Sequence, residues 1–95
     1  MDKIHAMQLF VRVAELESFS RAAETLTLPK GSVSRQIQAL ENRLGTQLLH
    51  RTTRRVTITE EGERIYEWAQ RILQDVGQMM DELSDVRQVP QGMLR

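Results

Sequence analysis

Five of the hydrogen-bond donors in the stretch "PKGSVSRQIQALENRLG", residues 29–45, could form a binding surface. They are Lys30, Ser32, Ser34, Arg35 and Gln38. Arg and Gln side chains can read the edges of bases in a major groove, and Lys and Ser side chains can hold phosphates. These residue types predict a surface that reads duplex DNA. The alternative is a plain solvated helix face, because Arg and Gln are also good helix formers.

A second group of cations follows in "RTTRR", where Arg51, Arg54 and Arg55 lie within five residues. A basic tip beside a recognition helix could place an arginine in an adjacent minor groove. Taken alone, such a turn could equally be a solubilising feature. The chain has zero net charge, yet residues 30–55 hold six bases and one acid, whereas 56–88 hold three bases and eight acids. This division is typical of a binding surface joined to a solvated arm, although it also arises by chance.

The remaining residues predict neither catalysis nor a cofactor or metal site. The chain has no cysteine, which excludes disulfides and cysteine-based metal sites. His5 and His50 have no ligand partner at suitable spacing and are interpreted as surface or structural residues. There is no nucleophile elbow and no Gly-rich phosphate loop. Because no signal peptide or membrane span is predicted either, we expect a non-enzymatic, cytoplasmic protein.

Apolar spacing predicts the helices that would position these groups. A first helix is expected over residues 3–16. Ser20 is the expected N-cap of a short second helix, which carries Ala22, Ala23 and Leu26. Pro29 disfavours helical geometry just before it, and only about three residues then precede the third helix. Two helices joined so tightly form a helix-turn-helix unit.

The third helix is expected to have two faces and a defined end. Its inner stripe, at 4-3-4 spacing, consists of Val33, Ile37, Leu40 and Leu44. Its outer stripe consists of Gly31, Ser34, Arg35, Gln38 and Asn42. Gly45 follows where a left-handed C-cap is expected. Of the donors described above, Ser34, Arg35 and Gln38 therefore share the face that points away from the core.

The pattern after Gly45 predicts a two-stranded ribbon and then a long helix. Residues 47–51 and 56–59 have strand-like composition, and the turn between them places Arg54 and Arg55 at or near its tip. Thr59 is expected to cap the long helix, whose first turn holds three glutamates. Gly62 in this first turn indicates a close packing contact.

The long helix carries an apolar seam of three heptads. The seam consists of Ile65, Ala69, Ile72, Val76, Met79, Leu83 and Val86. A helix over 59–88 would be about 45 Å long, too long to lie wholly against a small body. Ile65 and Trp68 are expected to pack on that body, while the residues from Val76 onward need another cover. A second copy of the helix is the expected partner, and a further domain beyond Arg95 is the alternative.

The chain resembles a known family in "LFVRVAELESFSRAAETL", "SVSRQIQALENRLGTQLLHR" and "RRVTITEEG". Residues 4–62 resemble the DNA-binding domain of LysR-type transcriptional regulators, and 63–88 resemble the family's linker helix. The resemblance implies a mostly α fold, a winged helix-turn-helix of three helices plus a two-stranded wing, followed by a long dimerisation helix. The implied division is a DNA-binding domain at 1–58, a linker helix at 59–88, and a hinge at 89–95 toward an absent effector-binding domain.

The same resemblance implies how the chain would act. A homodimer, held by an antiparallel pair of linker helices, would bind a pseudo-palindromic operator in double-stranded DNA. The third helix would enter the major groove, and Arg54 would reach the minor groove. A small-molecule inducer would act only through the absent domain, and tetramers in the full-length protein are left open. Many members begin the third helix with Gln-Pro, whereas Lys30 and Gly31 stand here, so Lys30 could donate to guanine or hold a phosphate.

A rival from another class is left open by the residues themselves. Winged helices can serve as docking domains for other proteins, and the basic segment at 30–55 could bind an acidic partner. Binding to generic duplex DNA at low salt would distinguish the two, because a docking module should show little of it.

Overall fold

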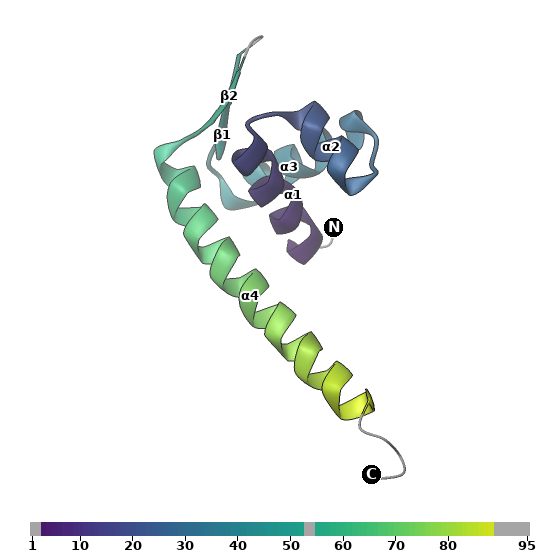
Figure 1. The fold of residues 1–95 in the computed structure, drawn as a ribbon. Coiled ribbons are helices and arrows are strands. Elements are labelled where there is room, and N and C mark those ends of the chain that lie inside the picture. Colours follow the sequence, from purple (N-terminus) through teal and green to yellow (C-terminus); the bar gives the residue numbers. More distant parts are fainter. Residues whose placement is uncertain (1–2, 53–54, 89–95) are drawn as a thin grey trace.

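The computed structural model describes residues 3–52 and 55–88 of the chain. The elements in chain order are α1 (Lys3–Leu16), α2 (Phe19–Leu26), α3 (Lys30–Leu44), β1 (Leu49–Arg51), β2 (Val56–Ile58) and α4 (Glu60–Gln88). The first three helices form one body, the β1–β2 hairpin projects from it, and α4 runs away from it (Figure 1). The predicted fold class, a winged helix-turn-helix followed by a long helix, is confirmed.

The hydrophobic core lies between α1, α2 and α3 and is closed by the hairpin. It consists of Ala6, Leu9, Phe10, Val13, Phe19, Ala22, Ala23, Val33, Ile37, Leu40, Leu48, Leu49 and Val56. The inner face predicted for α3 is confirmed at Val33, Ile37 and Leu40. It is wrong at Leu44, which is 45% exposed. Leu44 is the last residue of α3, so the buried stripe ends one turn earlier.

The turn between α1 and α2 begins with an unusual residue. Glu17 has a left-handed backbone, with φ 54°. Ser18 then has an extended backbone, and its hydroxyl accepts a hydrogen bond from the Arg21 amide at 3.1 Å. The prediction that Ser20 caps this helix is therefore wrong, because Ser18 already occupies that position and Ser20 lies in the first turn. At the far end of α3, Gly45 has φ 69°, as predicted for a left-handed C-cap.

Glu41 of α3 fixes where the hairpin begins. Its Oε2 atom accepts hydrogen bonds from the Leu48 amide at 2.8 Å and the Leu49 amide at 3.2 Å. The first strand starts only at Leu49, so the predicted strand at 47–51 is too long by two residues. The antiparallel register pairs Leu49 with Ile58 and Arg51 with Val56.

The junction between β2 and α4 is tightly packed. The Thr59 hydroxyl accepts from the Gly62 amide at 2.8 Å and donates to the Gln47 carbonyl at 2.7 Å. A Cβ atom at Gly62 would overlap the Leu48 carbonyl oxygen. The predicted cap at Thr59 and the predicted close contact at Gly62 are both confirmed.

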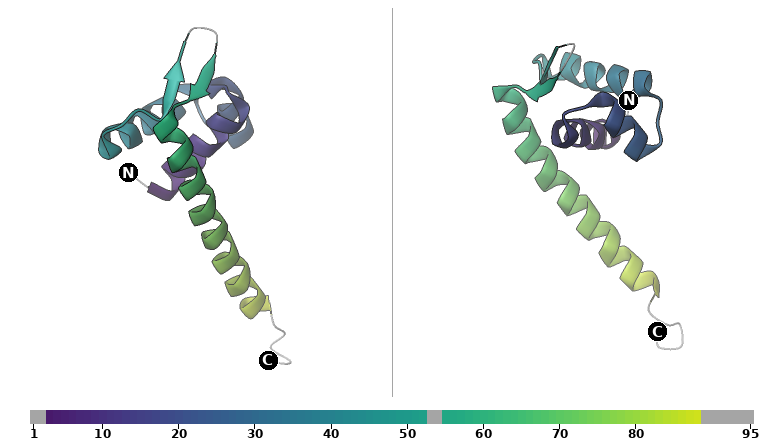
Figure 2. Two further views of the ribbon diagram at one scale, coloured as in Figure 1. Left: turned by 90° about the vertical axis from the view of Figure 1, so that its left-hand side faces the viewer. Right: turned by 45° about the horizontal axis from the view of Figure 1, so that its top comes forward.

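Over the described side chains of α4, up to residue 84, the first turns pack on the body. The rings of Phe10 and Tyr66 meet edge to face, with centroids 6.4 Å apart, and Ala69 is buried. Trp68 was expected to pack there too, but it is 58% exposed. One residue along a helix is a rotation of about 100°, so Trp68 points away from the face that Ala69 buries. Beyond this contact, α4 runs away from the end of the molecule that carries the wing (Figure 2).

Candidate nucleic-acid interface

The outward face of α3 carries the polar groups that the sequence placed there. Lys30, Arg35 and Gln38 are exposed, while Ser32 and Ser34 are half-buried at its edges. The buried face of the same helix holds it on the core, so these side chains project from a fixed backbone. A Cβ at Gly31 would lie 3.2 Å from the Arg35 Nη1 atom. Glycine at this position therefore leaves room for the Arg35 guanidinium to lie back along the first turn.

The two serines of this face already have partners within the chain. The Ser32 hydroxyl accepts from the Gln36 side-chain amide at 3.1 Å. The Ser34 hydroxyl accepts from Arg51 Nη1 at 2.9 Å. A hydroxyl that accepts can still donate its own proton. Both serines can therefore donate to a phosphate oxygen without losing these bonds.

Arg51 links three elements around the base of the wing. Besides Ser34 on α3, its guanidinium lies 3.9 Å from Glu41 Oε1 and 4.4 Å from the centre of the Phe19 ring on α2. Cation–π and ion-pair contacts of this kind hold an arginine in one place. The predicted contact of Arg51 with DNA stays a prediction, and the geometry adds a role in fixing β1 against α3.

The wing presents its remaining cations differently. Arg55 is exposed, and its Nη2 atom lies 3.7 Å from Glu17 Oε1. Thr52 and Arg55 close the base of the turn, because the Thr52 hydroxyl accepts from the Arg55 amide at 2.9 Å. Arg54, predicted to reach the minor groove, lies outside the described residues, so its placement stays a prediction.

The start of α3 and the base of the wing border one hollow. Lys30 of α3 and Arg55 of the wing both line it, together with Ser20, Thr52 and Glu17. The two groups of cations that lie apart in the sequence are therefore neighbours on one surface. The end of the molecule formed by α3 and the wing is remote from the C-terminal end of α4 (Figure 2).

Sequence reasoning missed three residues of this surface. Phe19 is given no role by the sequence patterns, yet the centre of its ring lies 4.4 Å from the Arg51 guanidinium. Glu41 and Glu17 are acids that pair with interface arginines. The signal for Glu41 was present, since it is the lone acid of the basic segment. Glu17 lies outside that segment, and only the folded turn brings it to the wing.

The residues predicted for the dimer interface divide along α4. Ala69 is 1% exposed and is covered by its own chain, while Ile65, Ile72 and Val76 are half-buried. Further along, the large apolar side chains are uncovered, at Met79, Met80 and Leu83. Val86 lies in α4, but its side chain is outside the described part, as is the expected hinge at 89–95.

Metal sites and membrane-spanning helices are two further possibilities for the described residues. No group of three or more His, Asp or Glu side chains there could hold a metal ion. Likewise, over 3–52 and 55–88, no helix has both the length and the apolar character that crossing a membrane would need. His50 is exposed on β1, opposite Thr57.

Known proteins match nearly the whole chain. The chain is 66% identical over 92 residues to the HTH-type transcriptional regulator DmlR of Escherichia coli K12, which covers 97% of this chain and 30% of DmlR. It is 47% identical over 89 residues to the HTH-type transcriptional regulator CrgA of Neisseria meningitidis, covering 94% and 30% of the two chains. The chain thus spans about 30% of the length of these curated relatives.

Solved structures also match most of the chain. The BenM DBD in complex with catB site 1 DNA superposes with a TM-score of 0.86 at 38% identity, covering 92% of this chain and 97% of that one. Full-length CbnR with its target DNA gives a TM-score of 0.81 at 34% identity, covering 87% and 29%. The model of the bacterial regulatory helix-turn-helix proteins of the lysR family matches residues 4–63. From this match, and from the shared fold, the chain belongs to the lysR family of bacterial regulatory helix-turn-helix proteins.

Proposed function

We propose that this chain binds double-stranded DNA in a sequence-specific manner, as the DNA-binding domain of a transcription regulator. The observation that carries the proposal is that Lys30 of α3 and Arg55 of the wing line one hollow, while Arg35 and Gln38 are exposed further along α3. An α-helix fits the major groove, and a wing beside it reaches the neighbouring minor groove. The BenM and CbnR structures, which contain DNA, support this assignment.

The side chains divide by chemistry between bases and backbone. Arg35 and Gln38 project from the middle of α3 and suit base edges. Lys30, Ser32 and Ser34 lie where a helix start meets the phosphates. Arg51, Arg54 and Arg55 belong to the wing, with Arg54 proposed for the minor groove. In this division phosphate contacts supply most of the affinity, and the base contacts supply the sequence preference.

A homodimer is the proposed active form. The seam residues Met79 and Leu83 are about half exposed, and Met80 beside them is too. A second α4 packed antiparallel would cover them and would hold two recognition helices at a fixed distance. Such a dimer suits a pseudo-palindromic operator whose half-sites lie about one or more helical turns apart. Tetramers and inducer binding would involve parts of the whole regulator that lie outside this chain.

The proposed activity is binding without catalysis, and the proposed place is the bacterial cytoplasm, where the nucleoid lies. The relatives' names support regulation rather than an enzymatic reaction. The division of the chain is proposed as a DNA-binding domain at 1–58, a linker helix at 59–88 and a hinge at 89–95. The bounds of α4, Glu60–Gln88, support the middle segment of this division.

Two experiments test the proposal. Fluorescence anisotropy with a random-sequence duplex should give binding that weakens steeply between about 50 and 200 mM salt. Selection of bound duplexes from a random pool should then enrich a sequence with two related half-sites. Absence of duplex binding at low salt would contradict the proposal and favour a protein-docking module. Binding without any enriched sequence would contradict sequence specificity alone.

A further inference from the structure

Glu17 places a carboxylate inside the proposed DNA interface. It lines the hollow that also receives Lys30 of α3 and Arg55 of the wing. Two hydroxyl residues, Ser20 and Thr52, border the same hollow. A surface built of cations and hydroxyls suits phosphate, and a carboxylate in it opposes phosphate. Glu17 therefore needs an explanation that the DNA contacts themselves do not provide.

The backbone of Glu17 does not explain the carboxylate. Its φ of 54° lies in the left-handed region, where glycine is relaxed and other residues are strained. The Glu17 amide donates to the Val13 carbonyl at 2.7 Å, which completes the end of α1. Both tasks belong to the main chain and would be met at least as well by glycine. What glycine could not supply is the side chain that reaches the wing.

The carboxylate reaches Arg55. Glu17 Oε1 lies 3.7 Å from Arg55 Nη2, and the two side chains are 52% and 68% exposed. An ion pair this exposed is weak and opens readily. While it is closed, it neutralises a cation of the wing and holds that guanidinium against the α1–α2 turn.

We infer that Glu17 restrains Arg55 and so lowers the affinity of the domain for duplex DNA of any sequence. The inference rests on the proposed function, and it further assigns the Arg55 guanidinium to a DNA phosphate. A phosphate that takes Arg55 must displace Glu17 and must approach its negative charge. Because non-specific binding comes from such phosphate contacts, the Glu17–Arg55 pair reduces the fraction of regulator held at unrelated sequences. Glu17 acts as a positioning residue and makes no contact with the bases.

Removing the negative charge should tighten binding. Glu17→Gln keeps the side-chain length and the strained backbone, and we expect it to bind a random-sequence duplex about two- to fivefold more tightly per subunit at low salt. The slope of log K against log salt should steepen by up to about 0.9, since one more cation is free to meet a phosphate. Glu17→Gly should show the same gain while also raising the melting temperature, because it relieves the left-handed strain.

Two further variants identify the cause. In an Arg55→Ala background, Glu17→Gln should give little or no gain, since the restrained cation is gone. Asp81→Asn removes the same charge from an exposed site on α4, far from the wing, and should leave affinity unchanged.

Three outcomes would overturn the inference. Equal affinity of wild type and Glu17→Gln would show that the carboxylate has no effect. A gain of the same size in the Arg55→Ala background, or in Asp81→Asn, would assign the effect to net charge rather than to the pair. Failure of the wild type itself to bind any duplex at low salt would instead contradict the proposed function, and the inference with it.

Discussion

The arginines of the interface differ in how firmly the fold holds them. Arg51 is fixed by Ser34, by Glu41 and by the ring of Phe19, so its guanidinium has one place in the folded chain. Arg35 is exposed and lies over Gly31 on the outer face of α3. Truncating Arg51 would disturb the base of the wing as well as any DNA contact. Truncating Arg35 leaves the core untouched, which makes it the cleaner probe of base readout.

Replacing Arg35 with alanine should weaken operator binding by about 1–3 kcal/mol and relax the preference at one base position. Its melting temperature should stay close to that of the wild type, because the side chain is exposed. Anisotropy titrations against the selected operator and against single-base variants measure both effects. Arg12→Ala, the same change on α1, is the matched control and should bind as the wild type does. Unaltered affinity in Arg35→Ala would remove Arg35 from the set of base-reading residues.

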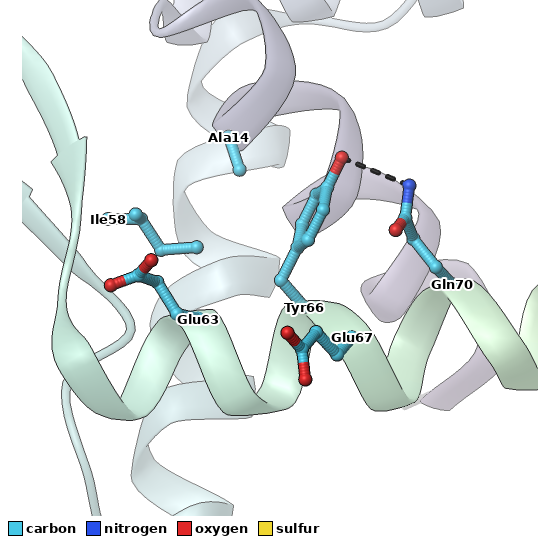
Figure 3. Close-up of a pocket in the computed structure, with 6 residues that line it drawn as sticks. All are labelled: Ala14, Ile58, Glu63, Tyr66, Glu67 and Gln70. Carbon is cyan, nitrogen blue, oxygen red and sulfur yellow. Dashed lines mark hydrogen bonds between the residues drawn. The ribbon is translucent and has the colours of Figure 1, made fainter.

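At the scale of elements, the attachment of α4 to the body depends on a short stretch. Thr59 caps the helix, Gly62 allows it to touch the Leu48 carbonyl, and Tyr66 packs on Phe10. Figure 3 shows Tyr66 in a hollow between α1, β2 and α4, with its hydroxyl directed at Gln70. These contacts fix the direction in which α4 leaves the body.

Gly62→Ala should lower the free energy of unfolding by about 1–3 kcal/mol, because the new methyl group would overlap the Leu48 carbonyl oxygen, a main-chain atom that cannot easily move aside. Gly77→Ala is the matched control in the same helix. Nothing lies within 4 Å of a Cβ there, so the better helix propensity of alanine should stabilise the protein by up to about 1 kcal/mol. Urea unfolding at one protein concentration measures both. If the two variants had the same free energy of unfolding, the close contact at Gly62 would be refuted.

Tyr66 predicts a pH dependence of stability. Burial raises the pKa of its hydroxyl above the usual 10.0, and the neighbouring Glu15 carboxylate adds to the effect, while the Gln70 hydrogen bond opposes it. The folded state therefore favours the neutral phenol, whose contribution is complete below pH 10 and is lost as the pH rises beyond it. Wild type should be more stable than Tyr66→Phe near neutral pH, and this advantage should shrink above about pH 10. A difference that does not change with pH would contradict the assignment.

The sequence predicted most elements but fewer of the details that depend on contacts between them. Apolar spacing located all four helices, since burial of one helical face is a local pattern. The N-cap at Ser18 instead of Ser20, and the late start of β1, were not predictable in this way. The strand begins late because Glu41, seven residues earlier, takes the Leu48 amide. The approach of Glu17 to Arg55 likewise joins residues 38 positions apart, and no local pattern encodes it.

The whole molecule is strongly elongated, with extents of 58 × 25 × 21 Å, because α4 continues well past the body. On its distal half, the large apolar side chains of Met79, Met80 and Leu83 are about half exposed. Exposed apolar side chains in a row at heptad spacing favour association with a second helix. The shape of the single chain thus supports the proposed dimer.

Leu83→Asp should dissociate the dimer, because a carboxylate in a helix pair is costly to bury. Operator affinity should fall with it, since two linked recognition helices bind more tightly than separate ones. Gln74→Asp is the matched control: it adds the same charge on the opposite side of α4 and should leave the dimer intact. Sedimentation analysis measures the association state. A Leu83→Asp protein that still sediments as a dimer would refute the seam.

The tightness of the β2–α4 junction has a mechanical consequence. Only Thr59 separates the last residue of the wing strand from the first residue of α4, and its hydroxyl is hydrogen-bonded to Gly62 of α4 and to Gln47, just before β1. With 29 residues, α4 is about 43 Å long, and no flexible segment separates it from the wing. Because Tyr66 and Ala69 also pack on the body, the first turns of α4 and the body form one rigid unit. A rotation of this unit by about 10° would move the far end of α4 by about 7 Å. A displacement of several Å at the C-terminal end of α4 therefore corresponds to a small rotation of the wing.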